Sequence, residues 1–115
     1  MNKLIAILVF IALTACTATK LLTPTQADAD RGAKTYQGYT LADLNKGKSL
    51  FEGNCNRCHA LKNPASRNAD KWERIVPVMV KRANKKAGST IINDTDQSLI
   101  LHYLVTMSTA PEPAK

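Results

Sequence analysis

The sequence predicts an all-α domain built from about three main helices. Apolar residues recur at three- and four-residue spacing in three separate stretches, as they do on one face of a helix. Each of these stretches follows a polar residue of the kind that caps a helix. No stretch alternates apolar and polar residues in the manner of a half-buried strand. At 115 residues, the chain suffices for one modest domain with appendages.

The first fifteen residues are predicted to be an export signal. Lys3 precedes the apolar run "LIAILVFIAL", which is too short to cross a bilayer comfortably as a permanent helix. The run ends in "LTAC", which resembles the lipobox of bacterial lipoproteins. This resemblance implies that residues 1–15 form a lipoprotein signal peptide and that Cys16 is acylated and begins the mature chain. The alternative is an ordinary signal peptide in which Cys16 is incidental.

A lipid on Cys16 would anchor the exported protein without making it span the membrane. Thr17 stands where many lipoproteins retained in the inner membrane carry an aspartate, so the periplasmic side of an outer membrane is weakly favoured. Residues 16–39 are mostly polar and small, which predicts a lipid-anchored tether with a short helix after Pro24. If that stretch were flexible, its root-mean-square reach would be about 25–30 Å.

The first main helix is predicted to begin at Thr40, which forms a capping-box-like pair with Asp43. Its apolar face contains Leu41, Leu44, Gly47 and Phe51. A glycine inside a helix lowers its stability relative to alanine. Gly47 therefore indicates close approach by another element.

The second helix is predicted to follow a capping pair of Asp70 and Glu73. Its apolar face contains Trp72, Ile75, Val76, Met79 and Ala83. Pro77 cannot donate a hydrogen bond to the carbonyl of Glu73, which predicts a kink or restart there.

The third helix, "QSLILHYLVTM", is predicted to be capped by Asp94 and Gln97. Its apolar face contains Leu99, Ile100, Tyr103 and Met107. The domain is thus expected over residues 40–110, followed by a flexible tail over residues 111–115. A core this small is marginal without a cofactor, metal or cross-link.

The stretch "CNRCHAL" supplies a candidate cofactor site. Cys55, Cys58 and His59 form the Cys-x-x-Cys-His pattern of c-type haem attachment. Two thiols at this spacing reach the two vinyl groups of one porphyrin, and the adjacent histidine supplies the proximal nitrogen to the iron. Three alternatives are weaker. A closed zinc site needs more ligands, a thioredoxin-like pair needs a βαβ context, and a disulfide closing so short a loop adds little stability.

From Leu41 to Met107 the chain resembles the small monohaem cytochromes c, class I in outline. "GKSLFEGNCNRCHAL" is similar to the first helix and haem site of that family, and "SLILHYLVTM" to its last helix. Gly47, Phe51 and Tyr103 match a glycine and two aromatic residues that pack together in the family. The resemblance implies a few helices around one covalently attached haem c, and one-electron transfer without catalysis.

The iron's distal axial ligand is expected to be Met79, because methionine is common in electron carriers. The run from Trp72 to Met79 also resembles a subgroup of short exported cytochromes c in which a methionine at this spacing binds iron. The alternative is that Met79 only fills the core. Met107 is expected to pack against the first helix, and His102 to face solvent, although His/His ligation stays open.

Pro64 is a candidate for orienting His59. In the family, a proline carbonyl soon after the motif accepts a hydrogen bond from the proximal histidine, which fixes the ring. Pro64 follows His59 more closely than in many relatives, and it is otherwise only a turn residue.

The positive charge is concentrated in one segment. Residues 62–86 contain eight basic residues against Asp70 and Glu73. Such a segment could steer a redox partner protein with an acidic docking surface, balance the haem propionates on a solvated face, or meet anionic lipid headgroups. No recognition motif points to nucleic acid.

The sequence as a whole predicts a lipid-anchored electron-transfer protein rather than an enzyme. Two alternatives remain open. One is an electron-accepting subunit of an exported dehydrogenase or reductase complex. The other is a haem-based ligand sensor with an open sixth position.

Overall fold

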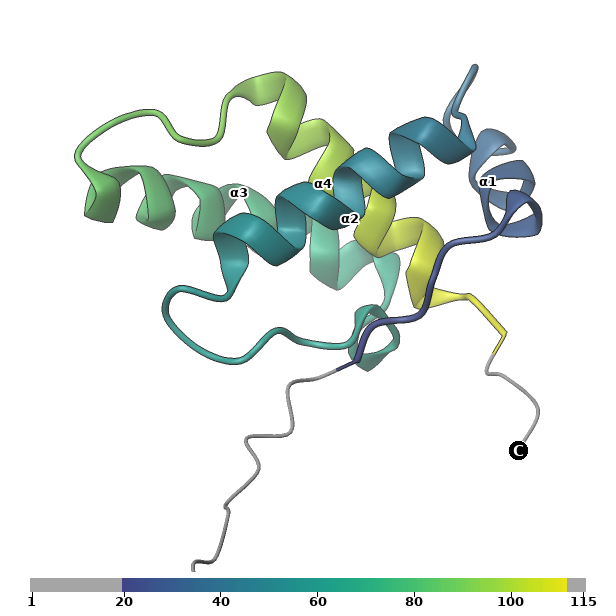
Figure 1. Cartoon of the computed structure of the whole chain (residues 1–115), viewed down its shortest axis with the longest axis horizontal. Coiled ribbons are helices and arrows are strands. Elements are labelled where there is room, and N and C mark those ends of the chain that lie inside the picture. The colour runs from purple at the N-terminus through teal and green to yellow at the C-terminus, as the bar shows by residue number, and fades with distance from the viewer. Residues whose placement is uncertain (1–19, 112–115) are drawn as a thin grey trace, which may run out of the picture.

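The computed structural model describes residues 20–111, and these residues form helices without any strand (Figure 1). The elements are α1 (Gln26–Ala33), α2 (Leu41–Cys55), the 3-10 turn η1 (Pro64–Ser66), α3 (Ala69–Ala87) and α4 (Asp94–Ser108). The predicted all-α class is therefore confirmed. The expected signal peptide, Cys16 and most of the expected tail lie outside the described residues.

Within residues 20–111, no helix is both long enough and apolar enough to cross a membrane.

The start of α2 is the predicted one. The Thr40 hydroxyl accepts a hydrogen bond from the Asp43 N–H at 3.2 Å, and the Asp43 carboxylate accepts one from the Thr40 N–H at 2.9 Å. This reciprocal pair satisfies two amides that the helix leaves without internal partners.

The caps predicted for α3 and α4 were wrong. Asn68 caps α3 by accepting a hydrogen bond from the Lys71 N–H at 3.0 Å, in place of the pair Asp70 and Glu73. Asn93 caps α4 in the same way, in place of the pair Asp94 and Gln97. An asparagine side-chain oxygen reaches the third amide of a helix as readily as a serine or aspartate oxygen does.

Helix α3 continues through Pro77, where a kink or restart was expected. Pro77 and Glu73 are both exposed, so water can hydrogen-bond to the carbonyl that loses its helical partner. The helix ends at Gly88, whose φ of 70° lies in the left-handed region that glycine adopts without strain. Trp72, Ile75 and Met79 therefore lie on one continuous helix.

Helices α2 and α4 cross at the centre of the molecule (Figure 1). A Cβ added to Gly47 would overlap the carbonyl oxygen of Leu99 and lie 2.8 Å from Tyr103 Cβ. The rings of Phe51 and Tyr103 pack beside this contact with centroids 5.8 Å apart. The close approach predicted from Gly47 is confirmed.

Residues 20–39 differ from the expected tether because they pack onto the domain. The short helix expected after Pro24 is present as α1, and Leu21, Ala29 and Tyr39 are buried. Helix α1 carries few large apolar side chains, so it packs through small residues. A Cβ at Gly32 would lie 2.8 Å from the Thr106 hydroxyl of α4.

Candidate functional site

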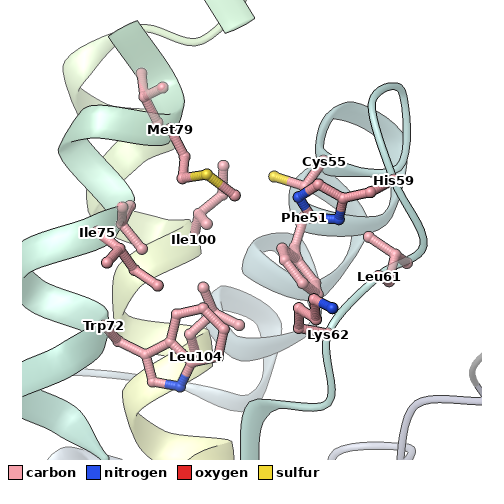
Figure 2. A pocket seen from close by; sticks show the side chains of 12 residues that line it. Phe51, Cys55, His59, Leu61, Lys62, Trp72, Ile75, Met79, Ile100 and Leu104 are labelled. Carbon is pink, nitrogen blue, oxygen red and sulfur yellow. The ribbon is translucent and has the colours of Figure 1, made fainter. Parts of the chain in front are cut away.

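A small apolar pocket, with a cavity volume of about 30 Å³, lies between the loop that follows α2 and the inner face of α3 (Figure 2). The pocket is lined by Phe51, Cys55, His59, Leu61, Lys62, Trp72, Ile75, Val76, Met79, Val80, Ile100 and Leu104. The wall of the pocket is therefore mostly apolar, and its few polar side chains lie on the side formed by the end of α2 and the following loop.

Cys55 and His59 form that polar side. Cys55 is the last residue of α2 and is half-buried, and this burial raises the pKa of its thiol to about 11. His59 lies in the following loop with its ring at the pocket, and its Nδ1 is 2.8 Å from the carbonyl oxygen of Ala60. Cys58 is exposed and is not among the described residues that line the pocket, and the Lys86 ammonium donates to its sulfur over 3.6 Å.

Met79 lies on the opposite side of the pocket. It extends from α3 beside Ile75, and it is half-buried. Figure 2 shows its sulfur pointing across the pocket toward the sulfur of Cys55, with His59 on the far side. The structure therefore brings Met79 of α3 to the same pocket as Cys55 and His59, which lie at the end of α2 and in the loop that follows it.

Met107 and His102 lie elsewhere. Met107 is buried and borders a groove with Leu22 and with Ala27 of α1, and its packing against α2 stays a prediction. His102 was expected to face solvent, but it is half-buried and stacks on Tyr36 with ring centroids 3.7 Å apart. This burial lowers the pKa of His102.

Pro64 has a different partner from the one expected. Its buried carbonyl accepts a hydrogen bond from the indole N–H of Trp72 at 2.9 Å, while His59 lies against the carbonyl of Ala60. This bond ties η1 to α3 and fixes one end of the pocket wall. The guanidinium of Arg67 covers the outer face of the indole, 5.2 Å from the ring centroid.

Replacing Trp72 with phenylalanine is expected to lower the free energy of unfolding by about 1–3 kcal/mol, because the buried carbonyl of Pro64 loses its donor. Urea unfolding followed by circular dichroism measures this change. Arg67→Gln is the control, since it removes only the half-exposed cation over the ring and should cost less than about 1 kcal/mol. Equal losses in the two variants would show that the indole hydrogen bond is not the stabilising contact.

A basic groove adjoins the pocket. It is lined by Lys62, Ser66, Arg67, Asn68, Lys71 and Arg74, and Lys62 also lines the pocket. The concentration of charge seen in the sequence thus includes four cations beside the candidate site. Neither Asp70 nor Glu73 is among the described residues that line this groove.

Sequence reasoning missed the contributions of Ile100, Leu104 and Leu61 to the pocket wall. Leu104 is not part of the apolar face that we predicted for its helix. In the structure, the pocket wall extends further around α4 and includes Leu104. Leu61 is a single apolar residue in a loop, and periodicity cannot detect such a residue. The Trp72 to Pro64 hydrogen bond joins two elements and gives no local pattern.

No family model, curated protein or solved structure matches this chain.

Proposed function

We propose that this protein carries single electrons on one covalently attached haem c and is held at a membrane surface by a lipid on Cys16. One observation carries the proposal. Cys55 and His59 of the Cys-x-x-Cys-His motif line an apolar pocket, and the thioether of Met79 lies on the opposite wall.

The residues present fit such a group by their chemistry. Cys55 and Cys58 are free thiols that can form thioether bonds. An imidazole from His59 and a thioether from Met79 are a ligand pair that electron carriers use for haem iron. The bound group would supply a one-electron ferric/ferrous couple. Leu61, Ile100 and Leu104 would exclude water from the site, and a drier site changes the reduction potential.

The basic groove would attract a negatively charged partner to the edge of the pocket. If that partner is an acidic redox protein, the cations raise the encounter rate, and the effect weakens as salt increases. Lys62 is placed to act both on such a partner and at the pocket itself.

The proposal is tested by expressing the full chain in a bacterium that attaches haem to exported proteins. The polypeptide should retain haem after denaturation, and the ferric protein should show the weak near-infrared band of methionine sulfur bound to iron. Mass spectrometry of the mature chain should find acyl groups on Cys16.

Two results would favour the alternatives. A high-spin ferrous spectrum with ready binding of carbon monoxide would indicate an open sixth position. Stable co-purification with a larger oxidoreductase would indicate a subunit of a complex. A chain that retains no haem would contradict the proposal itself.

A further inference from the structure

The N-terminal segment of the described chain is fixed to the domain from Leu21 onward. Leu21 and Pro24 are buried. The Thr25 N–H donates to the Asp28 carboxylate at 2.8 Å. The guanidinium of Arg31 donates both to that carboxylate, at 2.9 Å, and to the Thr106 carbonyl of α4, at 3.0 Å. These contacts link the segment to α4, so it cannot act as a long flexible tether.

The chain leaves the domain beside the candidate site. Lys20, Leu21 and Thr23 line a groove with the second half of α2 and with Leu61. Leu61 also lines the apolar pocket, and its neighbour Lys62 lines both the pocket and the basic groove. Figure 1 shows the purple segment at residues 20–25 running toward the teal loop between α2 and α3.

This exit leaves a short connection to the proposed lipid anchor. Cys16 and Lys20 are separated by four Cα–Cα steps, which span at most about 14 Å when fully extended. A flexible stretch over residues 16–39 would instead reach about 25–30 Å. We call the side of the domain at which the chain leaves, beside Lys20 and Leu61, the exit side. A lipid on Cys16 would therefore keep the exit side near the headgroups at all times.

We infer that the exit side docks on anionic phospholipid through a basic rim, defined as Lys20, Lys62, Arg67, Lys71 and Arg74. This inference rests on the proposed function because it requires the lipid on Cys16. It adds an orientation, with the rim and the adjoining edge of the pocket turned toward the bilayer.

Charge complementarity supports this occupant. Residues 54–69 contain Arg57, Lys62 and Arg67 but no acidic residue. Glu52, which lines the groove at the exit, forms an ion pair with Lys48. A cation close to an anionic bilayer contributes about 1 kcal/mol, equivalent to roughly five-fold in binding. Lipid is favoured over an acidic protein because the short connection holds lipid headgroups permanently within reach.

The test uses the native lipidated holoprotein in vesicles made of equal parts phosphatidylcholine and phosphatidylglycerol. An amine-reactive reagent labels lysines, and mass spectrometry measures the labelling rate at each position. Lys20, Lys62 and Lys71 should react several-fold more slowly in these vesicles than in detergent. Lys46, exposed on α2, is the internal control and should react at equal rates. Vesicles of phosphatidylcholine alone should give weaker protection.

A variant with fewer positive charges tests whether the cations of the rim cause the docking. The double variant Lys71→Gln/Arg74→Gln should weaken the attraction by roughly five-fold per cation and return Lys20 labelling toward its rate in detergent. Lys46→Gln is the matched control and should leave Lys20 protected. Neither variant changes a residue that lines the pocket.

The outcomes separate this inference from the proposed function. A mature chain without acyl groups on Cys16 would overturn both the proposed anchorage and the docking. Acylated protein with equal protection of Lys46 and Lys62 would overturn the docking alone. Protection that appears only when an acidic protein is added would also overturn it, in favour of a protein-docking surface.

Discussion

Replacing Met79 with alanine is expected to abolish the near-infrared band of the ferric protein and to open the sixth position of the iron. The thioether is the group that the structure places across the pocket from His59. Without it, the ferrous protein should become high-spin and bind carbon monoxide readily. The reduction potential should fall, since axial ligands set potentials over a range of about 0.8 V and methionine lies toward the positive end.

The matched control is Met107→Ala. Met107 is buried near α1, so its truncation should lower the free energy of unfolding by about 2–5 kcal/mol while the near-infrared band persists. Absorption spectra and redox titration of both variants measure the difference. A band that survives in Met79→Ala and disappears in Met107→Ala would refute the ligand assignment, even though Met79 borders the pocket.

The candidate site was predictable where its chemistry is local. Cys55, Cys58 and His59 fall within five consecutive residues, and Met79 belongs to a helical face whose period is visible in the sequence. The partner of Pro64 was not predictable, because Trp72 lies eight residues away and the contact depends on how η1 folds against α3. The stacking of His102 on Tyr36 likewise depends on packing between distant segments.

The helices were predictable from apolar spacing, but some of their surroundings were not. Helix α1 lacks a stripe of large apolar residues, and Ala29 and Gly32 instead allow it to approach α4 closely. A search for large apolar residues therefore misses helices that pack through alanine and glycine. Asn68 and Asn93 show a second limit, because two polar residues within two positions of each other can both fit a capping pattern, and only the backbone selects one.

Replacing Gly47 with alanine is expected to lower the free energy of unfolding by up to about 2 kcal/mol. Alanine favours a helix over glycine by roughly 1 kcal/mol, but the added Cβ would overlap the backbone carbonyl of Leu99 and press on Tyr103. Overpacking of this kind costs about 1–3 kcal/mol and occasionally more. A backbone carbonyl inside α4 cannot rotate away as a side chain can, so the helices must separate.

Gly53→Ala is the control for this prediction, because Gly53 belongs to the same helix and a Cβ there would meet no atom within 4 Å. That variant should raise the free energy of unfolding by roughly 0.5–1 kcal/mol. Urea unfolding of both variants therefore separates helix propensity from the crossing of α2 and α4. If both variants gained stability, the crossing would be looser than the structure shows. Loss of stability in Gly47→Ala alone would show that α2 and α4 approach each other as closely as the structure indicates.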